Sequence, residues 1–234
     1  DRYCTDPAYM TVNPSDFLTR EALAERAKKI NMQRALPWPQ DPWQGDTIWM
    51  GCIDSEGRTA SFIQSVFWEF GSGVVCPSTG VMWQNRGISF SLKEDALHRL
   101  EPGRKPFHTL NPAMARFKDG RSMVYGTMGG EGQPQTQAAV FSRYALFNQP
   151  LQTAVTAPRW LLGRTWGEQS TSLKLESRFD EQLVAQLRDA GHVLEVLPEA
   201  FSDTMGHAGA VVRHPNGMME GAADPRSDGS VACA

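Results

Sequence analysis

Thr47 is the residue whose surroundings point most directly to chemistry. It follows Gly45 and Asp46, where a segment rich in proline and tryptophan meets the first predicted strand. If the bond between Asp46 and Thr47 is cut, Thr47 carries a hydroxyl beside a free α-amino group. An α-amino group has a pKa of about 7.7–8.0, so it can take the proton of that hydroxyl and make it a nucleophile. A threonine at the start of a strand is also common, and this ordinary structural role stays open.

A second hydroxyl belongs to Ser65, on the strand that follows. Residues 47–54 and 59–67 flank a Ser-Glu-Gly-Arg turn, a pattern typical of a β-hairpin. Across such a hairpin, Ser65 would face Thr47 and hydrogen-bond its hydroxyl. The alternative is that Ser65 is an ordinary polar residue of a strand.

A Gly-Gly pair, Gly129 and Gly130, lies between a predicted strand and the start of a predicted helix. The surrounding stretch 126–135 lacks the Gly-Lys-Ser/Thr ending of a phosphate loop and the spacing of a dinucleotide-binding fingerprint. Consecutive glycines let backbone N–H groups approach a ligand closely, and a helix N-terminus favours negative charge. The pair is therefore a candidate oxyanion hole, with a tight turn that binds nothing as the alternative.

Two polar clusters rimmed by aromatic residues and prolines supply candidate binding groups. Arg86 could form a bidentate pair with a substrate carboxylate, and Asn85 lies next to it. His108 and Thr109, in the second cluster, could donate hydrogen bonds to a substrate. Residues of these types are more often found in solvated loops, and that is the alternative for each.

Composition excludes several other functions. The chain has 234 residues, a net charge of −3 and 21% charged residues, so it carries no basic footprint for nucleic acid. No apolar run is long enough to span a bilayer, and no membrane partner is expected. The four cysteines and five histidines do not fall at metal-ligand spacing, so neither a metal nor another cofactor is predicted. We expect a cytoplasmic location, with the periplasm as the alternative.

The predicted elements place these residues on an α+β scaffold. A helix is expected at 19–30, and an extended linker at 36–46, where three prolines prevent a regular helix or strand. After the hairpin, the sequence predicts a strand pair at 73–83 broken at Pro77–Gly80, strands at 122–128, 171–177 and 192–198, helices at 134–148 and 179–191, and a hairpin at 208–222 that turns at His214–Gly217. Antiparallel hairpins alternating with blocks of helix indicate sheets packed together with helices outside.

Taken together, these segments resemble the small subunit of gamma-glutamyltranspeptidases. The resemblance covers Thr47 to Asp228 and rests on GDTIWMGCIDSEGRTASFIQS, FGSGVV, WQNRG, PGRKPFHTLNPAM, YGTMGGEGQPQ, APRW and GAADPRSDG, in that order. The opening DRYCTDPAYM is similar to the last portion of that family's large subunit. We therefore divide the chain into residues 1–46, the end of the large subunit with its linker, and 47–234, the small catalytic subunit.

The resemblance implies an N-terminal-nucleophile hydrolase with a four-layer αββα sandwich. It implies self-cleavage between Asp46 and Thr47, with Thr47 as the nucleophile and its α-amino group as the base. Ser65 falls where the family has a threonine that hydrogen-bonds the nucleophile, and Gly129 and Gly130 match the oxyanion-hole pair. The partners implied are a small amide substrate and the large subunit of the same precursor, with a dimer of heterodimers as a further expectation.

Departures from the family pattern concern the substrate. Phe67 stands where gamma-glutamyl enzymes have an asparagine, Arg86 replaces a glutamine, and Ser89 replaces the aspartate that holds the substrate amino group. His108 and Thr109 replace a pair of serines that touches the substrate carboxylate. Losing the contacts for an amino group while gaining an arginine favours a different acid.

This pattern resembles the family branch that includes oxamate amidohydrolase, of purine and allantoin breakdown. It implies a pocket formed by the substrate-binding residues Phe67, Asn85, Arg86, His108 and Thr109, in which Arg86 and Thr109 hold the carboxylate. The segment 90–106 is short, so the family's lid loop is absent, and the C-terminal SDGSVACA is expected to fold over the site instead. Gamma-glutamyl hydrolysis or transfer, acylase action on a related amide, and a non-catalytic binding protein on the same fold are the alternatives.

Overall fold

The computed structural model describes residues 5–34, 46–68, 70–163, 165 and 170–233. The extended linker predicted at 36–46 lies outside these ranges, apart from Asp46. None of the helices in the described ranges has the length and apolar content needed to cross a lipid bilayer.

The first sheet is the predicted hairpin of β1 (Asp46–Ile53) and β2 (Thr59–Phe67), which pair antiparallel. Its turn is closed by Asp54, whose N–H donates to the Arg58 carbonyl at 3.0 Å and whose Oδ1 accepts from the Arg58 N–H at 2.8 Å. Gly57 supplies the positive φ of 84° that the turn requires. The hairpin carries both Thr47 and Ser65.

The second sheet has the strand order β3-β4-β8-β9, and every pair in it is antiparallel. Its strands are β3 (Ala113–Arg116), β4 (Ser122–Thr127), β8 (Ala208–Arg213) and β9 (Met219–Ala223). The predicted turn between β8 and β9 is confirmed by hydrogen bonds from the N–H of His214 to Met218 and from that of Gly217 to His214.

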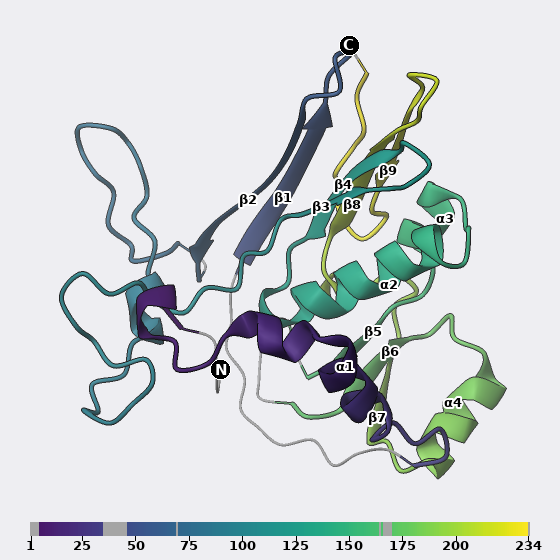
Figure 1. Cartoon of the computed structure of the whole chain (residues 1–234), viewed down its shortest axis with the longest axis horizontal. Coiled ribbons are helices and arrows are strands. Elements are labelled where there is room, and N and C mark those ends of the chain that lie inside the picture. The colour runs from purple at the N-terminus through teal and green to yellow at the C-terminus, as the bar shows by residue number, and fades with distance from the viewer. Residues whose placement is uncertain (1–4, 35–45, 69, 164, 166–169, 234) are drawn as a thin grey trace.

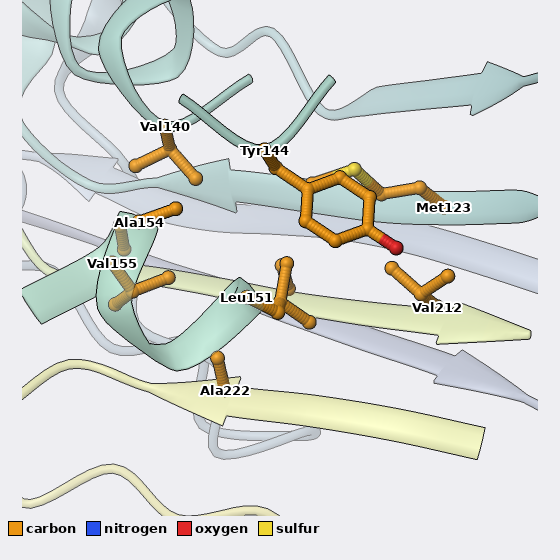
Figure 2. Packing of buried hydrophobic residues seen from close by; sticks show 10 residues of the cluster. Met123, Val140, Tyr144, Leu151, Ala154, Val155, Val212 and Ala222 are labelled. Atoms are coloured by element: carbon orange, nitrogen blue, oxygen red, sulfur yellow. The ribbon is translucent and has the colours of Figure 1, made fainter. Parts of the chain in front are cut away.

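Helices α2 (Gln133–Ala145) and α3 (Leu151–Thr156) cover one face of this sheet (Figure 1). The main core lies between these helices and the sheet, where Met123 and Val212 of the sheet meet Tyr144 and Leu151 of the helices (Figure 2). Pro134 lies in the first turn of α2, where its missing N–H leaves no helix hydrogen bond unmade. This packing fixes the start of α2, and with it the Gly-Gly pair just before that helix.

The β1–β2 hairpin packs on the opposite face of the sheet, and one tryptophan fills the space between the two layers. Gly126 of β4 and Gly209 of β8 leave room for the Trp49 ring, since a Cβ on either would come within 2.5 Å of it. The Trp49 Nε1–H donates to Ser61 Oγ across the hairpin at 2.9 Å. This indole holds β1 against the sheet two residues after Thr47.

The outer face of the hairpin has no such cover among the described residues. Ile48, Met50 and Phe62 share that face and are 44–56% exposed. The described residues therefore form three layers: helix, sheet and hairpin.

A smaller sheet, ordered β5-β6-β7, contains β5 (Trp160–Leu162), β6 (Leu173–Glu176) and β7 (Leu194–Leu197). The expectation that strands come in antiparallel hairpins is wrong for β6 and β7, which pair in parallel. They are joined by the predicted helix α4 (Glu181–Asp189), and a crossover of this kind brings two strands together in the same direction. The helix ends before Gly191, whose φ is 94°, as expected.

The remaining elements are short. The predicted N-terminal helix is α1 (Arg20–Ala27), capped by the Thr19 hydroxyl. The strand pair expected at 73–83 is reduced to one bridge between Val75 and Met82 within a loop. Short 3-10 helices cover Pro7–Tyr9, Pro14–Leu18, Arg86–Ser89, Gly130–Gly132 and Asp203–Met205.

Candidate active site

Thr47 is almost buried, at 9% exposure, and its side chain contacts Ser65 across the hairpin. The Thr47 hydroxyl donates to Ser65 Oγ at 3.0 Å. Ser65 Oγ also accepts the backbone N–H of Phe67 at 2.9 Å. A hydroxyl with two hydrogen bonds has a fixed position, so Ser65 orients the Thr47 hydroxyl.

The hairpin register changes at Thr47. Asp46 pairs with Phe67 and Ile48 with Gln64, so the single residue Thr47 lies opposite two residues of β2. A β-bulge of this kind twists the strands and re-aims nearby side chains, and bulges are enriched beside active sites. The bond between Asp46 and Thr47, the predicted cleavage site, lies at this bulge.

The end of β2 carries a second local irregularity. Phe67 has a φ of 79°, a left-handed conformation that a bulky side chain rarely adopts. Asn85 helps to hold this bend, since its side-chain Oδ1 accepts the N–H of Trp68 at 3.0 Å and its backbone N–H donates to the Val66 carbonyl at 3.1 Å. Asn85 thus acts here as a support for the backbone and brings the next residue, Arg86, onto Phe67.

Arg86 is buried, at 3% exposure. Its guanidinium lies 3.9 Å from the centre of the Phe67 ring and donates to Thr109 Oγ1 at 3.2 Å. In the part of the chain that the structure describes, no carboxylate pairs with it. Burial lowers the pKa of Arg86 to about 10, because a charge removed from water is disfavoured.

Contacts therefore run without a break from Thr47 through Ser65 and Phe67 to Arg86 and Thr109. Two cavities lie along this line. Thr47 and Met128 line a cavity of about 590 Å³. Phe67 and Thr109 line another, of about 350 Å³, together with Ser89 and Glu131.

Gly129 and Gly130 connect the two cavities along the chain, because Met128 lines the first and Glu131 the second. Their φ angles of 129° and 49° lie in the region that favours glycine. Among the described residues, neither glycine N–H has an acceptor. Two unengaged N–H groups just before α2 are suitable donors for an anion.

His108 is separated from the other predicted binding residues. It is exposed, its Nδ1 accepts the N–H of Leu110 at 3.3 Å, and it lines a third cavity, with Asp6 and Lys105. Partial burial of the imidazole ring, and then the charge of Arg86, lower the pKa of His108. Thr109 lines the 350 Å³ cavity and accepts the hydrogen bond from Arg86, whereas His108 lines the third cavity instead.

Sequence reasoning missed a buried ionic network behind the site. Arg226 Nη2 and Nε reach the two carboxylate oxygens of Glu176, both at 2.6 Å, and Arg159 Nη2 lies 2.7 Å from Asp224 Oδ2. All four side chains are at most 6% exposed. Three of them, Arg159, Asp224 and Arg226, belong to the segments APRW and GAADPRSDG, but nothing in the sequence indicated their pairing.

This network is connected to the glycine pair. Arg159 Nη1 donates to the Gly206 carbonyl at 2.8 Å, and Asp224 Oδ2 accepts the N–H of Ala208 at 2.5 Å. Gly206 lies against Met128, whose carbonyl would be 2.6 Å from a Cβ at that position. The network thus holds the segment that packs against the residue before Gly129.

The site therefore combines a hydroxyl at a proposed chain start, a pair of unengaged N–H groups and a buried cation. When Thr47 has a free amino group, that group can take the proton of the hydroxyl and make it a nucleophile. The N–H pair can stabilise an oxyanion, and the cation can hold a carboxylate.

Comparison with known proteins adds the following. The model of the gamma-glutamyltranspeptidase family matches residues 1–234. The chain is 58% identical to the oxamate amidohydrolase proenzyme of Klebsiella pneumoniae, over 99% of this chain and 44% of that protein. It is 40% identical to a glutathione hydrolase-like proenzyme, YwrD, of Bacillus subtilis, over 98% of this chain and 43% of that protein. The chain thus spans less than half the length of these relatives.

Among solved structures, cephalosporin acylase from Bacillus halodurans matches with a TM-score of 0.80 and 32% identity, over 98% of this chain and 41% of that one. The α+β fold of the N-terminal-nucleophile hydrolase type, expected from the sequence, is confirmed. The resemblances to the family and to its oxamate amidohydrolase branch are confirmed as well.

Proposed function

The chain belongs to the gamma-glutamyltranspeptidase family, and we propose that it carries the catalytic part of a self-processing threonine amidohydrolase that converts oxamate to oxalate and ammonia. The relative named oxamate amidohydrolase proenzyme supports this substrate. The proposal also rests on the chemistry of the pocket described above.

The observation that carries the proposal is the burial of Arg86 with no carboxylate partner among the described residues. Burying an unpaired charge is costly, and the cost falls when an anion of matching geometry binds. A guanidinium that already lies on the Phe67 ring, beside the Thr109 hydroxyl, is preorganised for a bidentate carboxylate. Its contacts lead back to Thr47, so the anion that it binds would be small and close to the nucleophile.

The same pocket argues against an amino-acid head group. By the resemblance, Phe67 stands where gamma-glutamyl enzymes have an asparagine for the glutamate head group, and Ser89 where they have the aspartate that holds the amino group. Both residues line the 350 Å³ cavity. Oxamate has one carboxylate, one amide and no amino-acid head group. It therefore requires only the cation and the hydroxyl that the pocket provides.

In the proposed reaction, the α-amino group of cleaved Thr47 takes the proton of its own hydroxyl, and Oγ1 attacks the amide carbon. The N–H groups of Gly129 and Gly130 stabilise the oxyanion of the tetrahedral intermediate. The proton passes to the leaving nitrogen, the C–N bond breaks, and ammonia departs from an ester on Thr47. Water, activated by the same amino group, hydrolyses the ester to oxalate and restores the threonine.

The proposed partner is the large subunit of the same precursor. Cleavage before Thr47 would divide the chain into residues 1–46 and 47–234. The exposed apolar face of the hairpin, with Ile48, Met50 and Phe62, is where the fourth, helical layer would pack. A dimer of such heterodimers and a cytoplasmic rather than periplasmic location stay predictions, which light scattering and cell fractionation would test.

The experiment is to purify the full-length protein and to determine its mass and N-terminal sequences before an assay with oxamate. We expect a fragment that begins Thr-Ile-Trp-Met and release of ammonia and oxalate. The Thr47→Ala variant should stay uncut and inactive. An uncut wild-type chain with its fold intact would remove the amino base and, with it, this mechanism.

One observation favours a second candidate, hydrolysis or transfer of a gamma-glutamyl group. Glu131 lines the cavity of Phe67 and Ser89 and could hold a substrate amino group in place of the missing aspartate. A gamma-glutamyl anilide assayed beside oxamate decides between them. If the protein cleaves itself yet releases more product from the anilide than from oxamate, a gamma-glutamyl compound replaces oxamate as the proposed substrate. An uncut protein that binds oxamate without turnover would indicate a binding protein on the same fold.

A further inference from the structure

Residues far upstream of the proposed cleavage site pack against the loop that carries Thr109. Figure 1 shows the purple N-terminal segment beside the blue-green loops that follow β2. Asp6 is the centre of this contact and is 7% exposed. Its Oδ2 accepts the backbone N–H of Lys105 at 2.8 Å, and its Oδ1 accepts that of Ala8 at 3.1 Å.

Arg104 strengthens the same contact from the side of the loop. Its guanidinium lies 4.1 Å from the centre of the Tyr9 ring and donates to Thr5 Oγ1 at 3.4 Å. It also hydrogen-bonds the Leu97 carbonyl and pairs with Glu101 at 3.3 Å. The upstream segment therefore holds the stretch around 105 directly, and the stretch around 97 only through Arg104.

Both stretches form the wall of the pocket beside Arg86. Leu97, Phe107 and Thr109 all line the 350 Å³ cavity. Lys105 precedes Pro106, whose ring fixes φ near −65°, so holding the Lys105 N–H restricts the path of the chain to Thr109. Thr109 in turn accepts the hydrogen bond from Arg86.

We propose that Asp6 is a positioning residue for the substrate pocket and acts across the cleavage site, by holding the 104–109 loop so that Thr109 and Arg86 meet the substrate carboxylate. The inference rests on the proposed function for the identity of that substrate. After cleavage, Asp6 and Lys105 belong to separate chains. The upstream chain then keeps a role in substrate affinity that continues after processing.

A merely structural role for Asp6 would be the cap of the short helix Pro7–Tyr9, through its bond from Ala8. The two roles use different carboxylate oxygens. The variant Asp6→Ser separates them, because a serine hydroxyl is also a good N-cap acceptor but is too short to span the distance to Lys105. Capping alone predicts that serine is harmless, whereas positioning predicts that it is not.

The test compares full-length, self-processed wild type with Asp6→Ser and with Asn13→Ala. Asn13 caps the next short helix in the same segment, is exposed, and contacts no part of the loop through its side chain. Asp6→Ser should raise KM for oxamate by about tenfold, as for the loss of a hydrogen bond to a charged group, with kcat within about twofold of wild type. Asn13→Ala should leave both constants unchanged. Mass spectrometry first confirms that each variant is cleaved.

Hydrogen exchange of the amides in residues 104–110 provides a readout without substrate. We expect the amide of Lys105, and the amides of the fragment that contains Thr109, to exchange faster in Asp6→Ser than in wild type or in Asn13→Ala. Unchanged exchange, or faster exchange with an unchanged KM, overturns the inference. If wild type does not hydrolyse oxamate, the proposed function fails while the exchange experiment still decides whether Asp6 holds the loop.

Discussion

At the scale of single residues, the chemistry of this pocket depends on the guanidinium of Arg86. This group is buried on an aromatic ring beside a hydroxyl, and no carboxylate among the described residues pairs with it. One face of the Arg86 guanidinium lies on the Phe67 ring, and Nη1 at its edge donates to Thr109. Because its pKa is lowered by burial, the free protein holds this charge at a cost, and a bound anion relieves that cost. Ligand binding and protein stability should therefore be coupled at Arg86.

We predict that Arg86→Lys lowers kcat/KM for oxamate by about 100-fold, chiefly through KM, since an ammonium neither stacks on the ring nor binds a carboxylate in bidentate fashion. Steady-state kinetics would check this, with oxalate-induced thermal stabilisation as a second readout. The matched control is Arg121→Lys. Arg121 also lies over a phenylalanine, Phe117, but pairs with its own carboxylate, Asp119. Equal losses in both variants would refute the assignment.

Ser65 supports a second prediction at this scale. Ser65→Ala removes the acceptor for the Thr47 hydroxyl and for the Phe67 N–H, so both self-cleavage and kcat should fall, kcat by about tenfold. Ser65→Thr restores the hydroxyl and should recover most of the rate. Stopped time courses of cleavage on a gel and initial rates measure the two effects. A threonine variant as slow as the alanine variant would show that hydroxyl contact is not what Ser65 contributes.

At the scale of elements, the position of β1 depends on Trp49. The ring occupies the space left by Gly126 and Gly209, and it holds the strand that carries Thr47, the proposed nucleophile. A strand fixed in this way can keep Thr47 in place after the chain on its N-terminal side is cut. The tight fit also makes the two glycines sensitive positions.

Gly209→Ala should destabilise the protein by about 1–3 kcal/mol, because its Cβ would lie 2.5 Å from the Trp49 ring in a packed layer. Urea denaturation measures the change. Gly87→Ala is the control, since a Cβ there has open space around it. If Gly209→Ala is as stable as the control, the indole does not fill the space between the layers as tightly as these contacts imply.

The elements also show how far the sequence alone could reach. The hairpin of Thr47 and Ser65, α2 and α4 were predicted, because turn residues, caps and Pro134 mark them locally. β3, β5 and α3 were missed: each has three to six residues, too few for a periodic pattern to develop. The contact of Thr47 with Ser65 followed from hairpin register, whereas the division between His108 and Thr109 depends on where a loop packs.

At the scale of the whole molecule, the buried ionic network joins segments that are distant in the sequence. Glu176 ends β6, Arg226 follows β9, and their pairing is nonlocal, so no local pattern could indicate it. A buried pair adds little net stability but makes the loss of one partner expensive. The network therefore makes the packing of the small sheet on the core a condition for the site.

We expect Glu176→Gln to cost about 3–5 kcal/mol of folding free energy, since it leaves two buried arginines of the network, Arg159 and Arg226, to share the single carboxylate of Asp224. Equilibrium denaturation of the full-length protein measures this cost. Glu195→Gln is the control: Glu195 pairs with Lys174 but is half-exposed, and the loss should be at most about 1 kcal/mol. Similar losses in the two variants would contradict the role assigned to burial.

The C-terminal segment supports a last prediction, because residues 227–232 line the cavity of Thr47 and Val231 packs against Gly221 of β9. If this segment covers the site in place of the lid loop that the resemblance leads us to expect missing from 90–106, deleting Ser227–Ala234 would open the proposed nucleophile to water and to larger amides. We expect kcat/KM for oxamate to fall by about tenfold or more, and the preference for oxamate over a bulkier anilide to narrow. Val231→Ala, which keeps the segment but loosens its contact with Gly221, should give a smaller change in the same direction. Unchanged kinetics in the deletion variant, with the fold intact, would show that the segment covers the cavity without shaping the reaction.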